Sequence, residues 1–337
     1  MASPTTVPGS VTRAASFEHC PPAVEPRPRG RWATGDFVVC EMLGSGPDSY
    51  RVETPSGAYE EINPGDRIIG ALGARAATLE AVGDWRAVGE DLILDTLTAA
   101  GVLGRCTSAA IPPPPMTEVR YLGHAVRGGK ACTMRGSLEP APVRKLEAPV
   151  VLIIGTSMDA GKTVTAAAIV RELADMGRRV AGAKLTGVGR YRDILAMREA
   201  GAQYIADFVD AGLPSTVVPR EEFESALLLL CSKLAASEPD VVVAEAGASP
   251  LEPYNGDAAM RLLAENVRAT VLCASDPYAV VGVMSAFETR PDLTAGRATS
   301  TEAGIALVEK LTSIPAINVL DPASGPKLAS FLRERLS

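Results

Sequence analysis

The feature that most constrains this chain is a continuous apolar run followed by a glycine loop and a helix. Residues 150–154 (VVLII) form an apolar run with the length of a buried strand. A loop ending in Gly-Lys-Thr at 161–163 follows, and then alanines and leucines recur at helical spacing up to Gly177, a helix stop signal. A Gly-Lys-Thr loop in this position is typical of a phosphate cradle, because its backbone N–H groups and the helix N-terminus face the anion.

The loop is one residue longer than the commonest form, which places four residues between its first glycine and Gly-Lys. Here five residues separate Gly155 from Gly161. A Gly-Lys-Thr tripeptide can also arise by chance in a helix cap, but the strand before it and the helix after it favour the cradle. Lys162 is then expected to reach the terminal phosphates of ATP, and the Thr163 hydroxyl to hold Mg²⁺. The predicted nucleotide contacts are Gly155, Thr156, Ser157, Met158, Asp159, Ala160, Gly161, Lys162, Thr163 and Val164.

The rest of the chain predicts a domain before the cradle. Residues 1–31 have the composition of a disordered tail, without the apolar segment of a secretory signal. Residues 32–135 contain short strand candidates at 37–43, 50–54, 67–72 and 119–122 and one helix candidate at 89–100. We expect a small β-rich domain there, in the form of a partly closed barrel. Residues 136–148 are interpreted as a linker, and 149–337 as the nucleotide-binding domain.

Composition narrows the functional classes. The net charge of −7 argues against nucleic acid or an anionic membrane as partner. No apolar run approaches the roughly 18 residues that span a bilayer. The six cysteines form no C-x-x-C pair, so we expect reduced thiols and a cytoplasmic protein. His19 and His124 are the only histidines, which excludes a histidine-rich metal site.

Strands and helices alternate beyond the linker, which predicts an α/β fold: a parallel sheet with helices on both faces. Ligands in such sheets bind at the carboxyl ends of the strands. Strands are expected at 150–154, 179–184, 215–218, 240–244, 269–274 and 315–319. Helices are expected at 162–176, 192–201, 221–236, 257–266, 278–288, 302–312 and 324–335.

Several predicted strands end in residues suited to phosphate chemistry. Lys184 ends the second strand and could neutralise a carboxylate or a transferring phosphoryl group; the alternative is a surface lysine. Asp193 follows at the start of a helix. Its carboxylate could complete the coordination shell of Mg²⁺, or it could simply stabilise the helix by interacting with the helix dipole. Glu245 ends the apolar run of the fourth strand, a usual position for a magnesium ligand. Asn318 ends the last predicted strand and could read a base edge or cap a turn.

These residues resemble the dethiobiotin synthetase and cobyric acid synthase group of P-loop proteins. The loop at 155–163 is similar to that group's longer Gly-Thr-x4-Gly-Lys-Thr form. In the resemblance, Lys184 matches the lysine that faces the substrate carboxylate, Asp193 a metal-binding aspartate, and Glu245 in Glu-Ala-Gly-Ala the magnesium-binding glutamate. The similarity covers about residues 148–320, and it suggests a homodimer.

A second resemblance is to uncharacterised P-loop families related to a D-glutamate N-acyltransferase, which share a Gly-Thr-x4-Gly-Lys loop. The β-rich front domain departs from both groups, so the resemblance does not identify the substrate.

Three functions follow as hypotheses. The first is a ligase in which Mg-ATP phosphorylates a small carboxylate or carbamate, with Lys162 and Lys184 as catalytic residues and Thr163, Asp193 and Glu245 as metal ligands. The second is a nucleotide-gated regulatory protein, motivated by the additional domain. The third is an acyltransferase that places an acyl-coenzyme A in the same cradle, since coenzyme A also carries phosphates.

Overall fold

The chain forms two compact units, seen in a computed structural model that describes residues 4–44, 50–140, 142–247, 249–287 and 289–336. The first unit comprises residues 1–140 with the short segments 188–192 and 208–218. The second comprises 141–187, 193–207 and 219–337. Membership of the two short segments in the first unit is not predicted by the sequence. Ala248, in the predicted Glu-Ala-Gly-Ala motif, and Glu288, at the end of a predicted helix, lie outside the described residues.

The first unit is β-rich, as expected, and its central strands close into a ring. Strands β6, β3, β11, β9 and β10 pair in that order, and β10 also pairs with β6, which completes a five-stranded barrel. Buried apolar side chains such as Val38, Ile68 and Leu103 form its core. The strands are β1 (Thr6–Pro8), β2 (Ala23–Glu25), β3 (Phe37–Met42), β4 (Tyr50–Glu53), β5 (Tyr59–Ile62), β6 (Arg67–Leu72), β7 (Ala74–Ala77), β8 (Ala81–Asp84), β9 (Ile93–Thr96), β10 (Val102–Ala109), β11 (Glu118–Arg127) and β12 (Lys130–Ala131).

Two expectations for this unit are wrong. The N-terminal region is not a disordered tail, because β1 pairs in parallel with β6 and Val7, Val11 and Phe17 are buried. The helix expected over 89–100 is absent, and β9 occupies its centre. Residues 93–96 form a strand because β9 then hydrogen-bonds with both β10 and β11 in the barrel wall. Tertiary pairing therefore overrides local helical propensity here.

His124 belongs to a buried polar network in the first unit. It lies on β11, where Nδ1 is 2.6 Å from the Tyr121 hydroxyl and Nε2 is 3.1 Å from Oδ2 of Asp36. The backbone N–H of Ala33 donates to the same Asp36 oxygen, and that of Arg27 donates to the Tyr121 hydroxyl. Both ring nitrogens of His124 thus have hydrogen-bond partners within the first unit.

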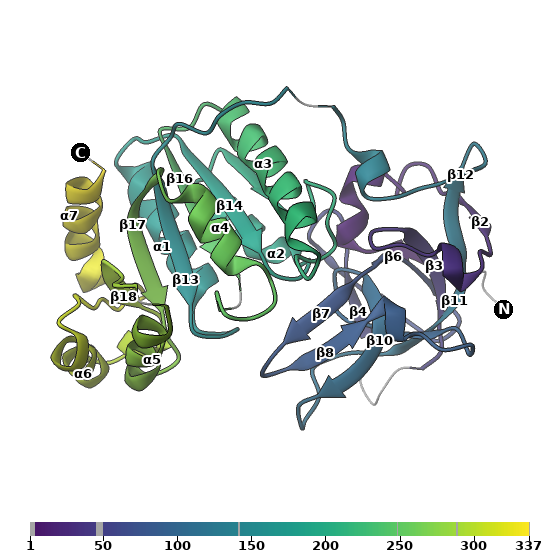
Figure 1. The fold of residues 1–337 in the computed structure, drawn as a ribbon, viewed down its shortest axis with the longest axis horizontal. Helices are drawn as coiled ribbons and strands as arrows, with labels where there is room; N and C mark the ends of the chain where they lie inside the picture. Colours follow the sequence, from purple (N-terminus) through teal and green to yellow (C-terminus); the bar gives the residue numbers. More distant parts are fainter. Residues whose placement is uncertain (1–3, 45–49, 141, 248, 288, 337) are drawn as a thin grey trace. The chain divides into compact units, whose positions relative to one another are not determined.

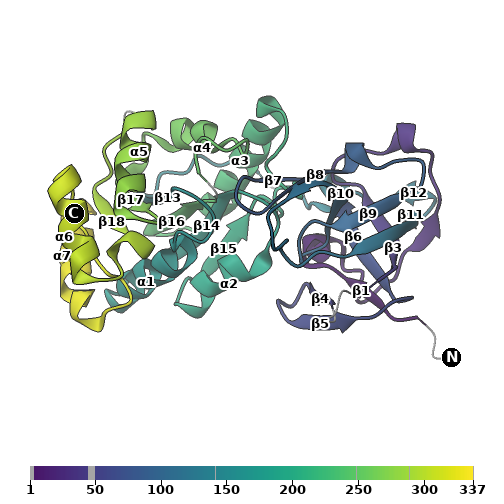
Figure 2. The ribbon, with the colours of Figure 1, turned by 90° about the horizontal axis from the view of Figure 1, so that it is seen from below.

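The second unit is a six-stranded parallel sheet covered by helices on both faces, as expected. The strand order is β15, β14, β16, β13, β17, β18. Helices α3 and α4 lie on one face and α1 and α2 on the other (Figures 1 and 2). The strands are β13 (Val150–Gly155), β14 (Val180–Thr186), β15 (Tyr204–Asp207), β16 (Val241–Ala246), β17 (Val267–Cys273) and β18 (Leu293–Ala295). The helices are α1 (Lys162–Asp175), α2 (Tyr191–Glu199), α3 (Arg220–Ala236), α4 (Gly256–Leu263), α5 (Pro277–Phe287), α6 (Glu302–Thr312) and α7 (Gly325–Arg335).

Two predicted strands of this sheet are wrong, and two observed strands are missed. Residues 215–218 belong to the first unit and contribute only an isolated bridge from Ser215 to Val188. Residues 315–319 contribute only a bridge from Ala316 to Thr294. The edge positions are taken by β15 and β18, which have four and three residues. Strands this short carry little periodicity.

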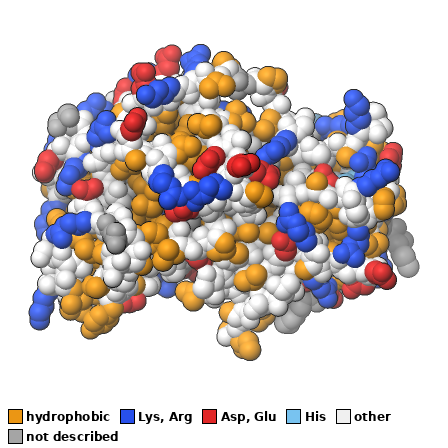
Figure 3. Space-filling model, viewed as in Figure 1, with side chains coloured by type: hydrophobic (Ala, Val, Ile, Leu, Met, Phe, Trp, Pro, Cys, Tyr) orange, Lys and Arg blue, Asp and Glu red, His pale blue; other side chains and the backbone are white. Residues whose placement is uncertain are grey.

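The exposed surface is mixed in charge. Lys and Arg are interspersed with Asp and Glu on the face shown in Figure 3. Among the described residues, no helix is both long and apolar enough to cross a bilayer.

Candidate active site

The phosphate loop connects β13 to α1 at the carboxyl edge of the sheet. All six residues of β13 are buried, and Thr156 N–H donates to the Cys273 carbonyl of the neighbouring β17 at 3.0 Å. Gly161 precedes α1 with φ of 99°, a conformation that favours glycine. The first turn of α1 carries no acidic side chain, and its leading N–H groups have no partner within the helix. This end of the helix is therefore suited to an anion.

Lys162 folds back over the loop that precedes it. Its ammonium donates to the Ser157 carbonyl at 2.6 Å, and the side chain is buried. Gly155 leaves the space for this path, because a Cβ there would lie 2.7 Å from Cδ of Lys162. Of the other predicted cradle residues, Met158 is half-buried, whereas Asp159 and Val164 are exposed. The ammonium thus lies against the backbone of the loop, between Gly155 and Ser157.

Thr163 and Glu245 meet beside the loop. The Thr163 hydroxyl donates to Oε2 of Glu245 at 3.2 Å, and Glu245 is only 3% exposed. Burial raises the pKa of this carboxyl, and the nearby Asp193 carboxylate raises it further. Lys184, Lys162 and the Thr163 hydrogen bond act in the opposite direction without cancelling the effect. A buried carboxylate of this kind gains from a cation placed next to it.

Strand register explains why Lys184 lies beside Glu245. Lys184 of β14 pairs with Glu245 of β16 on one side and with Asp207 of β15 on the other. Paired residues of a parallel sheet point to the same face, so three charged side chains form a row across three strands. Lys184 is 6% exposed. Parallel pairing therefore brings together residues that are far apart in the sequence.

Asp193, at the start of α2, forms an ion pair with the Lys184 ammonium. Burial lowers the pKa of Lys184, but the carboxylates of Asp193, Glu245 and Asp207 together outweigh burial and leave the pKa raised. The lysine is thus a buried cation at neutral pH. The interpretation of Lys184 as a surface lysine is wrong.

Asp207 is a site residue that the sequence reasoning missed. It ends β15 and is fully buried, next to Lys184 in the sheet. Its signal is the segment Tyr-Ile-Ala-Asp at 204–207, an apolar run closing on an acid, which is the same pattern that identified Glu245. The sequence analysis does not identify Asp207 because it predicts the third strand at 215–218 instead of 204–207.

The other flank of the loop faces β17 and β18. Ser275 N–H donates to the Thr156 hydroxyl at 3.1 Å, and Arg297 N–H donates to the Ala160 carbonyl at 3.2 Å. Asn318 is held by a turn: its Nδ2 donates to the Ser300 carbonyl and its Oδ1 accepts from Leu320 N–H. Asn318 thus caps a turn in this structure, next to the segment that follows Arg297.

The oxygen donors at the loop are suited to Mg²⁺. This ion takes one or two carboxylates together with waters and substrate phosphates. Thr163 and Glu245 supply a hydroxyl and a carboxylate 3.2 Å apart. No cluster of three or more His, Cys, Asp or Glu with the arrangement of a metal site occurs among the described residues. A site completed by phosphate oxygens is therefore the kind that these residues could form.

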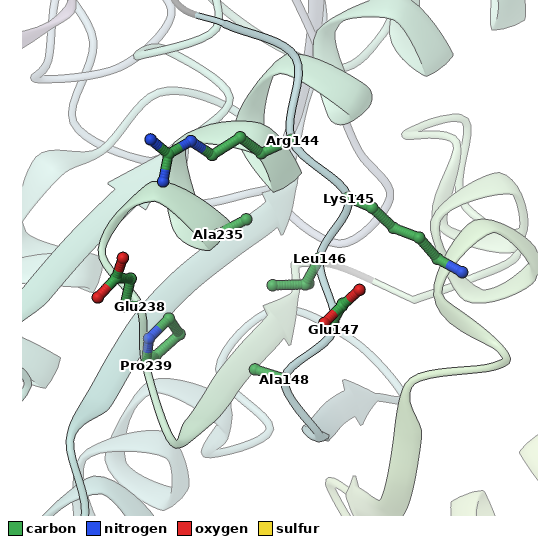
Figure 4. Close-up of a pocket in the computed structure, with 8 residues that line it drawn as sticks. All are labelled: Arg144, Lys145, Leu146, Glu147, Ala148, Ala235, Glu238 and Pro239. Carbon is green, nitrogen blue, oxygen red and sulfur yellow. The ribbon is translucent and has the colours of Figure 1, made fainter.

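A separate cavity of about 310 Å³ lies at the opposite edge of the sheet (Figure 4). Its walls are residues 144–148, which lead into β13, and Ala235, Glu238 and Pro239, which lead into β16. Arg144 and Lys145 point away from each other, and acidic side chains are interspersed with them. This cavity is at the amino ends of the strands, whereas the loop between β13 and α1 lies at their carboxyl ends.

Comparison with known proteins gives structural likenesses only. The sequence matches no protein-family model and no curated protein. Similar solved structures include the hydrogenase maturation factor HypB from Archaeoglobus fulgidus, with 16% identity, a TM-score of 0.40, and coverage of 56% of this chain and 91% of that chain. A chloroplast FtsY from Physcomitrella patens has 14% identity, a TM-score of 0.39, and coverage of 57% and 67%. A DUF1611 family protein from Anabaena variabilis has 17% identity, a TM-score of 0.38, and coverage of 60% and 63%. These likenesses do not confirm the dethiobiotin synthetase group.

Proposed function

We propose that this protein binds Mg-ATP in the loop at 155–164 and transfers the terminal phosphoryl group to a small carboxylate or carbamate. The observation that carries the proposal is the buried Lys184, in register with Glu245 beside the phosphate loop. Phosphoryl transfer needs mainly positioning and neutralisation of charge, rather than a covalent group from the protein. A buried ammonium at the carboxyl edge of the sheet supplies that neutralisation where the dielectric is low.

The roles follow from position. Lys162 would leave the Ser157 carbonyl and bind the terminal phosphates, while the N–H groups at the start of α1 hold the phosphate chain. Thr163 and Glu245 would hold Mg²⁺, which neutralises charge on the phosphate oxygens when bound. Lys184 would bind the carboxylate of the acceptor and stabilise the transferring group.

Asp193 has two roles in this proposal. In the structure its carboxylate neutralises Lys184. An anionic acceptor that binds Lys184 would compete for the ammonium and release Asp193, which would then be available as a further oxygen ligand for Mg²⁺. The ion pair would therefore hold the site in a neutralised form until the acceptor arrives.

The first test is a thermal-shift titration of the wild type and Lys162→Ala with Mg-ATP, Mg-GTP and acetyl-coenzyme A. Ligand at about one hundred times its dissociation constant should stabilise the folded protein by about 2.7 kcal/mol. We expect a shift with Mg-ATP that Lys162→Ala abolishes. A shift with acetyl-coenzyme A alone would favour the acyltransferase, and no shift with any of the three would contradict nucleotide binding.

The second test separates a ligase from a regulatory nucleotide binder. A ligase should release ADP rapidly only when a carboxylate or carbamate acceptor and its amine partner are present, whereas a regulatory protein should hydrolyse ATP slowly by itself. Lys184→Ala should bind Mg-ATP normally and lose acceptor-dependent turnover. Full turnover in that variant would remove Lys184 from the mechanism. A homodimer is a further proposal, and light scattering of the full chain tests it.

A further inference from the structure

The loop that follows β18 is pressed against the phosphate loop. Gly161 and Gly296 face each other: a Cβ on Gly161 would lie 2.9 Å from Cα of Gly296, and a Cβ on Gly296 would lie 2.1 Å from the Ala160 carbonyl oxygen. Both glycines have positive φ, 99° and 85°. Arg297 N–H then donates to that same Ala160 carbonyl. The backbones of the two loops are therefore in direct contact, with no side chain between them.

This contact places the backbone of Arg297 next to the cradle. Arg297 is exposed, and its guanidinium makes no hydrogen bond or ion pair with the part of the chain that the structure describes. The residues on both sides are buried and hydrogen-bonded. Before Arg297, the Ala295 carbonyl accepts from Ala274 N–H; after it, Ala298 N–H donates to the Ala274 carbonyl and the Thr299 hydroxyl to the Ile317 carbonyl. A backbone held by these hydrogen bonds therefore carries a long cationic side chain with no hydrogen-bond or ion-pair partner among the described residues.

The two flanks of the cradle have different chemistry. On the β16 flank, Thr163 and Glu245 supply the oxygen donors for the metal, which marks the terminal phosphates. Arg297 lies on the opposite flank, beyond β13 and β17 in the strand order. If the terminal phosphates lie on the β16 flank, the α-phosphate, which is closest to the nucleoside, would lie on the flank of Arg297.

We infer that Arg297 is a nucleotide-binding residue and that its guanidinium pairs with the α-phosphate. Guanidinium groups bind phosphate oxygens in pairs of parallel hydrogen bonds, which makes arginine well suited to this contact. The inference rests on the proposed nucleotide binding and adds to it a second cation, from a different loop than Lys162.

The experiment is a calorimetric titration of the full chain with two magnesium-loaded probes, the β,γ-imido analogue of ATP and pyrophosphate. Pyrophosphate carries the two phosphates that Lys162 and Thr163 address, but it has no α-phosphate. Arg297→Ala should weaken binding of the ATP analogue by about 10- to 100-fold and change pyrophosphate binding by less than about threefold. Arg297→Lys should fall between the wild type and Arg297→Ala, because it keeps the charge and loses the paired geometry.

Arg268→Ala is the matched control, because Arg268 is also exposed but lies near the start of β17, at the other edge of the sheet. It should bind both probes as the wild type does. Unchanged binding of the ATP analogue by Arg297→Ala would overturn the inference, and so would an equal loss for both probes, which would indicate a distorted cradle. A wild type that binds neither probe would instead contradict the proposed function itself.

Discussion

At the scale of single residues, the site is a row of opposite charges held out of water. Asp207, Lys184 and Glu245 are adjacent across three strands, and Asp193 adds a third carboxylate to the one lysine. Isolated charges in such an environment are costly, but they are tolerated when they pair. The lysine is therefore both a candidate catalytic group and the counter-ion that makes the acids compatible with folding.

Removing that counter-ion should destabilise the protein. Lys184→Met leaves buried carboxylates without their cation, and we expect a loss of about 3–5 kcal/mol in the free energy of unfolding. Denaturant titration at neutral pH measures it. The double variant Lys184→Met with Asp193→Asn should recover part of the loss, because one of the uncompensated charges is gone. Equal stability of wild type and Lys184→Met would show that the row is solvated.

Glu245 should reduce stability in the absence of ligand, with a defined pH dependence. Its pKa is raised above the ordinary value of 4.5, so the folded protein holds the proton more tightly than the unfolded chain. The cost is absent below that ordinary value and grows as the pH rises through the raised pKa. Glu245→Gln should therefore raise the melting temperature at pH 7.5 by a few degrees, with little gain at pH 4.

The same variant should lose the thermal shift produced by Mg-ATP, since the amide is a poor magnesium ligand. Glu245→Asp is the control, because it keeps the charge. A melting temperature that falls at pH 7.5 in Glu245→Gln would contradict the assigned direction of the pKa shift.

Much of the candidate site could be predicted from local sequence. Lys162 and Thr163 follow from the loop pattern, and Lys184 and Glu245 from apolar runs that end in a charge. Asp207 is not predicted as a site residue because the third strand is predicted at 215–218. Its place in the site follows only from the pairing of β15 with β14, which puts it next to Lys184. Arg297 has no local signal, since only the approach of two glycines in three dimensions brings it to the cradle.

At the scale of elements, the contact between the loop after β18 and the phosphate loop depends on glycine. Gly296→Ala would place a methyl group 2.1 Å from the Ala160 carbonyl oxygen in a residue with φ of 85°. We expect a loss of more than about 1 kcal/mol in stability. Gly282→Ala, within α5 and with open space around its Cβ position, should instead stabilise by about 0.4–1 kcal/mol. Thermal denaturation of both variants compares them, and a neutral Gly296→Ala would show that the loops can separate freely.

The elements that the sequence predicted well are the long ones. The strands β13, β14, β16 and β17 and the helices α1 to α7 lie close to their expected positions. The short edge strands β15 and β18 were missed because three or four residues do not establish a period. The apolar side chains of residues 315–319 predict a strand, whereas in the structure this segment contributes only an isolated bridge from Ala316 to Thr294 of β18.

At the scale of the whole molecule, the two units are interleaved along the chain. Segments 188–192 and 208–218 follow β14 and β15 in the sequence but belong to the first unit. Glu53 illustrates the interleaving: this fully buried carboxylate accepts hydrogen bonds from Ser10 and from the backbone N–H groups of Tyr191 and Arg192, all within the first unit. The sequence does not predict this interleaving, because the two short segments belong to the first unit only through contacts in three dimensions.

This interleaving predicts that residues 141–337 will not behave as an independent domain. Phe208, Val209 and Leu213 are buried in the first unit and would be exposed without residues 1–140. We expect the fragment to aggregate or to melt well below the full chain, by calorimetry or circular dichroism. Co-expression with residues 1–140 should restore the melting temperature. A fragment that unfolds cooperatively at the temperature of the full chain would contradict the division.

The interleaving of the two units also determines when the first unit can finish folding during synthesis on the ribosome. The first unit begins at the N-terminus, but it cannot be completed when residue 140 emerges, because its last segment ends at residue 218. At synthesis rates of about 5–20 residues per second, the unfinished barrel would wait for roughly ten seconds. During that interval the surfaces that later bury Phe208 and Leu213 are open, and a chaperone or a neighbouring nascent chain has its best opportunity to bind them.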